Sequence, residues 1–260
     1  SWLDEDENYL ADLAEKRRLI TEHRGKVFAE MPESRAAQRD ILKLITTELA
    51  EAHPGVMAPA PAFKDDAPLL AAAELVQEDL VLMRKSETHP GEYYLAAAAV
   101  CFPTGWNLTE KVGKVMRAIH HPVPDLNAAI GNPIDRFFRN LKPGKKVERF
   151  NWGLYDSAQL FQPGWWRDSR PLDDSISAGT VGEKIIFRVE RQTLQRLPDS
   201  SDILFTIRIF NTKLHEVCAE KARAQRLAHA IHTMPEAMKD YKSLPRYLTL
   251  IEDYVGAAAA

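Results

Sequence analysis

The fold is decided by two stretches in the second half of the chain, Lys184-Ile-Ile-Phe-Arg-Val-Glu-Arg-Gln-Thr-Leu194 and Ile203-Leu-Phe-Thr-Ile-Arg-Ile-Phe210. In the second stretch every other residue is a large apolar one, so that one face carries Ile203, Phe205, Ile207 and Ile209. A period of two residues is typical of a β-strand. The two stretches are joined by a short polar segment with a proline, 196–202, and therefore predict two paired strands.

Three further strands and several helices are predicted around this pair. Segments 79–85 and 92–102 flank a polar turn at His89-Pro-Gly91 and predict a hairpin, and 149–155 predicts a strand before the central pair. Apolar residues at three-and-four spacing predict helices over 4–53 (interrupted at 31–34), 107–121, 133–141 and 213–254 (divided at Leu244-Pro245).

The order of these elements is two strands, a block of helices and three strands, framed by terminal helices. This is also the order of a PAS domain, in which an antiparallel five-stranded sheet and its intervening helices hold a ligand. We therefore expect an α+β fold with a PAS-like antiparallel five-stranded sheet. The proline- and alanine-rich segment 54–69 reads as a linker. The expected divisions are an N-terminal helical segment and linker (1–66), a PAS-like domain (67–212) and C-terminal helices that pack on the core (213–256).

The composition excludes several classes of protein. The chain has 260 residues, 45% of them hydrophobic and 27% charged, and a net charge of −3, and no long basic run is present. This balance argues against nucleic-acid binding. The longest apolar run, 93–102, is too short to cross a bilayer. Two isolated cysteines, Cys101 and Cys218, favour a reducing, cytoplasmic compartment. Both ends read as trimmed, which leaves an upstream targeting or anchor segment open.

Segment 107–121 is predicted to be a capped amphipathic helix that ends on two histidines. Asn107 and Glu110 have the spacing of a capping box, and Pro122 bars the helix from continuing. An apolar stripe runs along this helix through Leu108, Val112, Val115, Met116 and Ile119.

His120 lies at the edge of that stripe on a helical wheel, above Gly113, whereas His121 turns to the charged side. A neutral imidazole on an apolar surface beside bare backbone is suited to ligate the metal of a large flat macrocycle. A core histidine hydrogen-bonded at a helix C-terminus is the alternative. His229 and His232, three residues apart on a helix, are a weaker pair of candidates for a metal.

Five motifs, in the same order, resemble the catalytic subunit of the haem-dependent oxidative N-demethylases, including fungal relatives of the HRQ family. The resemblance covers roughly residues 70 to 215. The motifs are Cys101-Phe-Pro-x-x-Trp106, the Lys111-Val-Gly113 helix, Ile119-His-x-Pro-Val-Pro124, Arg149-x-Asn-Trp152, and Glu190-Arg-Gln-Thr-Leu-x-Arg-Leu-Pro198 with Phe205-Thr-Ile-Arg208.

This resemblance implies a PAS-like fold that holds haem b, activates O2 and oxidatively removes a methyl group from a small amine. Electrons would come from a separate flavin and iron–sulfur reductase, and a homo-oligomer is compatible with the sequence. The family's ligating histidine corresponds to His120, while His121 falls on a variable position of the motif and is the fallback ligand.

The remaining haem contacts are expected from residues near His120 and on the strand 149–155. Gly113 and Met116 would lie along the macrocycle. Arg149 belongs to a basic group with Arg136, Arg139, Lys145 and Lys146 that could pair with the haem carboxylates. Trp152, like Phe137 and Phe138, could stack on the ring. A solvated basic face and an ordinary aromatic core are the alternatives.

Polar residues also alternate along the first central strand, where Arg188, Glu190 and Gln192 share a face. Such a stripe either faces solvent or lines a pocket that provides partners. In a pocket, Glu190 would hold an alkylammonium substrate, with Arg208 as its neighbour on the next strand, and Tyr155 or Arg208 would donate to bound oxygen.

Two other functions stay open at this stage. A PAS-like module could bind haem or another small ligand for sensing, without turnover, and would need the same proximal ligand. A scaffold subunit with a degenerate site would bind no haem.

Overall fold

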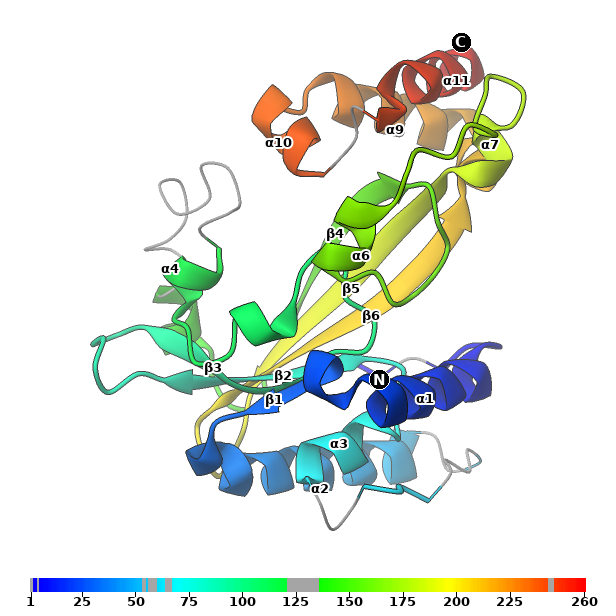
Figure 1. Ribbon diagram of the computed structural model, residues 1–260. Coiled ribbons are helices and arrows are strands. Elements are labelled where there is room, and N and C mark those ends of the chain that lie inside the picture. The colour runs from blue at the N-terminus through cyan, green and yellow to red at the C-terminus, as the bar shows by residue number, and fades with distance from the viewer. Residues whose placement is uncertain are drawn as a thin grey trace.

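The computed structural model describes residues 2–3, 5–52, 55, 60–63, 67–120, 136–242 and 246–260. In this part of the chain an antiparallel six-stranded sheet runs in the order β1-β3-β2-β6-β5-β4 (Figure 1). The strands are β1 (Phe28–Glu30), β2 (Asp79–Lys85), β3 (Tyr93–Ala99), β4 (Lys146–Tyr155), β5 (Ile186–Arg196) and β6 (Ile203–Lys213). The predicted α+β class is confirmed.

Helices lie on both sides of this sheet and at both ends of the chain. The N-terminal helices are α1 (Tyr9–Val27), α2 (Arg35–Ala52) and α3 (Pro68–Ala73), with the 3-10 turn η1 (Pro32–Ser34). The middle of the chain contributes η2 (Leu108–Glu110), α4 (Met116–Ile119), a helical turn at 136–140, α6 (Gly164–Ser169) and α7 (Val181–Lys184). The C-terminal helices are α8 (Leu214–Cys218), α9 (Lys221–His232), α10 (Glu236–Tyr241) and α11 (Leu248–Ala259). No helix among the described residues is long and apolar enough to cross a membrane.

The sheet has six strands and not the expected five, because β1 adds a strand at its edge. The sequence pattern indicated only an interruption between two helices near residues 31–34. In the structure β1 pairs with β3, from Phe28 opposite Ala99 to Glu30 opposite Ala97. Most of β3 is buried, and β1 supplies hydrogen-bond partners that its outer edge would otherwise lack.

The central hairpin β5–β6 is confirmed and is longer than its alternation indicated. Residues directly opposite each other share a face of the sheet, so Glu190 lies beside Ile209, and Arg191 lies beside Arg208. The two faces are named here the Glu190 face and the Arg208 face.

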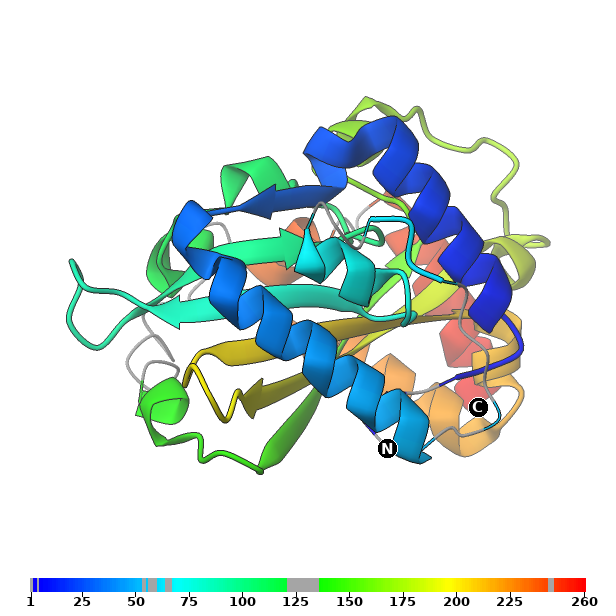
Figure 2. The same ribbon diagram turned by 90° about the horizontal axis from the view of Figure 1, so that it is seen from below.

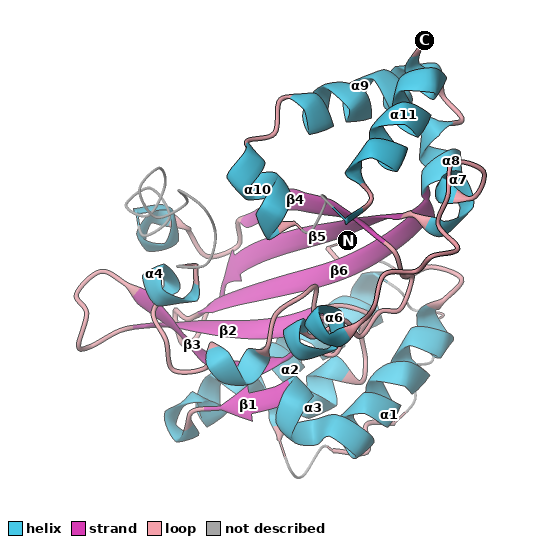
Figure 3. Cartoon of the chain, turned by 45° about the horizontal axis from the view of Figure 1, so that its top comes forward, coloured by secondary structure: helices cyan, strands magenta, loops and turns pink. Residues whose placement is uncertain are grey.

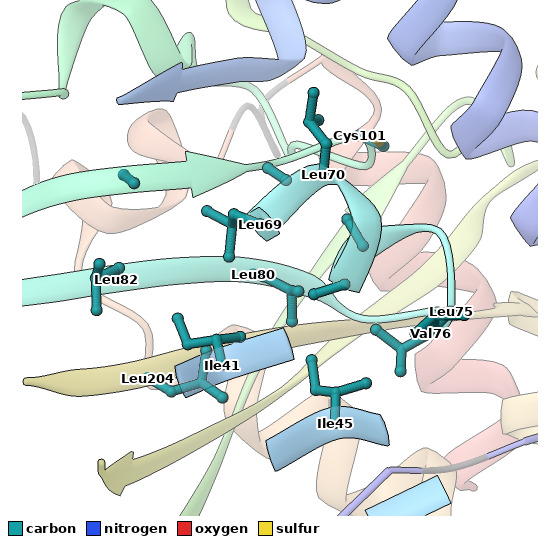
Figure 4. Close-up of a cluster of buried hydrophobic side chains, with 14 of the residues drawn as sticks. Ile41, Ile45, Leu69, Leu70, Leu75, Val76, Leu80, Leu82, Cys101 and Leu204 are labelled. Carbon is teal, nitrogen blue, oxygen red and sulfur yellow. The ribbon is translucent and has the colours of Figure 1, made fainter. Parts of the chain in front are cut away.

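The main core lies between α2, α3 and the Arg208 face. Figure 4 shows Ile41 and Ile45 from α2 and Leu69 from α3 beside strand residues Leu80 and Leu204. All five are fully buried. Burying one such side chain stabilises the fold by about 1.5–3 kcal/mol, so the N-terminal helices are held by the sheet (Figure 2).

The C-terminal helices form a second cluster at the far end of β4 and β5. Leu214, Leu227 and Ile251 are buried in it, and Leu154 of β4 joins them. The expected division point at Leu244-Pro245 lies outside the described residues.

Candidate functional site

The polar stripe of β5 is buried. Arg188, Glu190 and Gln192 have relative exposures of 1%, 8% and 5%. This excludes the alternative in which the stripe is a solvent-facing strand surface. Buried polar and charged groups require partners, so the contacts of these three side chains define the site.

A chain of hydrogen bonds crosses the Glu190 face from β4 to β5. Glu190 Oε2 accepts from Gln192 Nε2 at 2.7 Å and from Asn151 Nδ2 at 3.3 Å. Arg149 Nε donates to Gln192 Oε1 at 2.5 Å, and Lys242 Nζ donates to Asn151 Oδ1 at 3.0 Å. Lys242, Asn151, Glu190, Gln192 and Arg149 are named here the polar chain. It places one carboxylate between two cations.

The segment that carries His120 is not one helix, which corrects the prediction for 107–121. It consists of η2, a turn and the single helical turn α4, with His120 as the residue that follows α4. Pairing with β3 causes the break. Gly113 N–H donates to the Leu95 carbonyl at 2.8 Å, and Leu95 N–H donates to the Lys114 carbonyl at 3.1 Å.

Gly113 has a different role from the one expected, because it does not lie two helical turns before His120. Its φ of +77° is a left-handed conformation that favours glycine, so Gly113 forms the turn into the strand-like pairing. Asn107 occupies the N-cap position of η2, but its side chain makes no capping hydrogen bond: it donates to Glu110 Oε1 at 2.8 Å and accepts from the Gly164 N–H at 3.1 Å.

His120 is nevertheless half-buried and lies close to the polar chain. Burial, followed by the positive charges of Arg149 and Lys111, lowers the pKa of His120 to about 4. The imidazole is therefore neutral at pH 7 and retains a nitrogen lone pair for a metal. The backbone N–H of His120 donates to the Met116 carbonyl at 3.0 Å. Met116 and Ile119 pack on an apolar cluster of the Glu190 face, which includes Val81, Met83 and Leu194. His121 lies outside the described residues.

Among the described residues, the cations around His120 and Glu190 include Lys111, Arg149 and Lys242. Burial lowers the pKa of Lys111, Arg149 and Lys242. Each donates to a neutral acceptor: Lys111 Nζ to the Ile119 carbonyl at 3.1 Å, Arg149 to Gln192, and Lys242 to Asn151. Glu190 is the carboxylate that acts on both Arg149 and Lys242. The site is thus an electropositive surface beside a neutral histidine.

Tyr155 lies on the same face as Glu190, as expected. It occupies β4 four residues after Asn151, which is paired with Glu190. Gly153 leaves room for its ring, since a Cβ there would meet Tyr155 Oη at 2.6 Å. Arg188 lies within electrostatic range of Tyr155 and Glu190.

Arg188 fixes two loops over this face. Its guanidinium donates to the carbonyls of Phe102, Gln159 and Leu160 and to Thr104 Oγ1, at 2.9–3.0 Å. One buried side chain therefore positions both covering segments relative to Glu190.

Arg208 does not join the site, which corrects the expected pairing with Glu190. It lies opposite Arg191 on the Arg208 face and is fully buried. Its terminal nitrogens bind Asp6 at 2.6 Å and Asp12 at 3.4 Å, both from the N-terminal segment. In the register of β5 and β6, Glu190 lies opposite Ile209 and Arg208 lies opposite Arg191. Glu190 and Arg208 therefore point to opposite faces of the sheet.

Trp152 also faces away from Glu190. Its ring packs on Phe187 at 5.6 Å between centroids, next to the cluster of the C-terminal helices. Phe138 is a core residue that meets Tyr93 edge-on. His229 and His232 are exposed, and no cluster of three or more His, Cys, Asp or Glu side chains suited to a metal ion occurs in the described residues.

Sequence reasoning missed Lys111, Asn151 and Lys242. Asn151 could have been found, since it stands between Arg149 and Trp152 in a recognised motif. Lys242 could not, because it comes from a different part of the chain, 91 residues away from Asn151.

A family model described as "haem-dependent oxidative N-demethylase, alpha subunit-like" matches residues 1–251. The chain belongs to this family, as its motifs indicated. The match includes the N-terminal segment and the C-terminal helices up to α11, which extends well beyond the five motifs.

Proposed function

We propose that this protein is a haem-dependent oxygenase that removes a methyl group oxidatively from a small alkylamine, using O2 and external electrons. One observation carries the proposal: a half-buried, neutral His120 lies near the positive charges of Arg149 and Lys111, beside the Glu190 face. Membership of the N-demethylase alpha subunit-like family supports the reaction class.

The residues present fit a haem. The group needs an unprotonated imidazole for its iron, an apolar surface along its ring and cations for its carboxylates. His120 provides the first, and Met116 and Ile119 belong to the adjoining apolar cluster. Arg149 Nε is bound to Gln192, which leaves its two terminal nitrogens for a carboxylate. Lys111 holds the carbonyl just before His120 and so braces the ligand.

A bound haem would supply the O2 chemistry that ordinary side chains lack. The chain's own residues would orient the amine. Glu190 Oε2 accepts both amide donors of the polar chain, and Oε1 is the atom we assign to an alkylammonium group. Tyr155 is positioned by Gly153 on the same face and is the proposed hydrogen-bond donor toward the reacting centre.

The fold and the alpha subunit-like family also support two finer proposals. We infer that strands β2–β6, with the helices between β3 and β4, form a PAS-like unit with β1 added at its edge, and the strand order β3-β2-β6-β5-β4 supports this. A separate reductase subunit, carrying flavin and an iron–sulfur centre, would deliver the electrons.

Haem binding is the first test. Purified apoprotein titrated with haem should reach a Soret maximum at one equivalent, and His120→Ala should abolish or reshape that band. Retention of the wild-type spectrum at full occupancy in His120→Ala would exclude this ligand. Formaldehyde release from a methylamine, with reductant and O2 supplied, would distinguish an enzyme from a haem-binding sensor.

A further inference from the structure

Lys242 joins the C-terminal helices to the candidate site. It directly follows α10, which lies beside β4 (Figures 1 and 3). Its ammonium donates to Asn151 Oδ1 at 3.0 Å and to the Trp152 carbonyl at 2.5 Å. Its Nζ also lies 5.8 Å from the centre of the Trp152 ring. These contacts place a cation from α10 at one end of the polar chain.

The charge of Lys242 is poorly compensated. Both of its hydrogen-bond acceptors are neutral, and an ammonium has a third N–H to donate. Within the described residues no carboxylate forms an ion pair with it, and Glu190 acts on it from the far side of Asn151. A cation withdrawn from water without an anion costs free energy that a bound anion would recover.

Arg149 occupies the equivalent position at the other end of the polar chain. It too donates to a neutral side-chain amide, and it too feels Glu190. The two cations therefore bracket Glu190, one on β4 and one directly after α10, and each is placed to pair with one carboxylate of a haem.

We propose that Lys242 binds a carboxylate of the haem, so that the C-terminal helices complete the cofactor site. This inference rests on the proposed function. It adds to the site a residue of the C-terminal region 213–256, for which the sequence predicted only helices that pack on the core. The same ammonium would then tie α10 to β4 and to the cofactor.

The test compares haem with haem dimethyl ester, in which both carboxylates are neutralised. Apoprotein is titrated with each, and dissociation constants are obtained from the Soret band. Lys242→Gln should weaken haem binding at least tenfold, which is about 1.4 kcal/mol, and should leave ester binding unchanged. Lys242→Arg should restore most of the affinity for haem.

Lys239→Gln is the matched control, because Lys239 lies on α10 one turn earlier and is paired with Glu236 Oε1 at 2.9 Å. It should change neither affinity. An equal loss for haem and ester in Lys242→Gln would show that Lys242 only ties α10 to β4, and would overturn the inference. Unchanged haem affinity in that variant would overturn it as well. A wild-type protein that binds neither ligand would instead refute the proposed function itself.

Discussion

Glu190 is a buried carboxylate that shares one oxygen between two amide donors and lies near three cations, Arg149, Arg188 and Lys242. At the scale of single residues, this environment places a carboxylate where little water reaches it, and among the described residues no cation forms a direct ion pair with it. A charge held in this way can bind a ligand of opposite sign strongly, because little water screens the interaction.

Glu190→Gln should weaken amine binding at least tenfold and leave haem content unchanged. Gln keeps the shape and one acceptor oxygen but removes the charge that would hold an alkylammonium. The measurement is a titration of the amine-induced Soret shift. Glu148→Gln is the control, because Glu148 is exposed on β4 and belongs to the Arg208 face. Equal amine affinity in wild type and Glu190→Gln would remove Glu190 from substrate binding.

At the scale of elements, the segment between β3 and α4 decides where His120 lies. Gly113 turns the chain so that Lys114 and Val115 pair with β3, next to the place where β1 ends. Helical spacing of apolar residues over 107–121 is present in the sequence, yet this pairing interrupts the helix at residues 113–115, between η2 and α4. The positive φ at Gly113 marks the point where the chain leaves the helical conformation and turns to pair with β3.

Gly113→Ala should lower the free energy of unfolding by about 1–2 kcal/mol, since an L-residue at a left-handed φ is strained. Space is not the limit, because a Cβ there would meet only Met31 Sδ at 3.6 Å. Urea unfolding followed by circular dichroism measures the change. Gly25→Ala in α1 is the control: nothing lies within 4 Å of its Cβ position, and Ala favours a helix by about 0.5–1 kcal/mol. The idea is wrong if both variants shift stability in the same direction.

At the scale of the whole molecule, the N-terminal segment is tied to the sheet by buried charges. Arg208 on β6 binds Asp6 and Asp12, which are 202 and 196 residues away in the sequence. Lys16 of α1 donates to the carbonyls of Val76 and Glu78 just before β2. Breaking such a pair leaves an uncompensated buried charge, so these contacts are sensitive to substitution.

Arg208→Met should lower the free energy of unfolding by about 3–5 kcal/mol, because Asp12 would remain buried without its arginine. Lys213→Met, on the same strand, removes only an exposed pair with Glu183 and should cost less than about 1 kcal/mol. The amine-induced Soret shift of folded Arg208→Met should match that of wild type. A stable variant that has lost this shift would return Arg208 to the catalytic site.

The strands were readable from the sequence because side-chain alternation directly reflects the two faces of a strand. The pair β5–β6 was predicted on this basis, and β2–β3 was predicted from two apolar segments that flank a polar turn; their bounds differ by only a few residues. β1 was missed, since three residues are too few to show a period. The family could also be predicted from the sequence, because its motifs are recognised by residue type and order and no knowledge of the fold is needed.

The sequence by itself determined the α+β class, the family, His120 as the candidate ligand and the alternation of side chains within each central strand, whereas the register that separates Glu190 from Arg208 came from the structure. The tertiary structure decided which of those faces carries the site and which ties down the N-terminal segment. It also divided the predicted helix 107–121 into η2 and α4, and it brought Lys242 to Asn151. The physical reason is that a local sequence pattern reports only how side chains alternate along one helix or strand. The burial of a charged side chain and its charge partners depend on residues that are distant in the sequence.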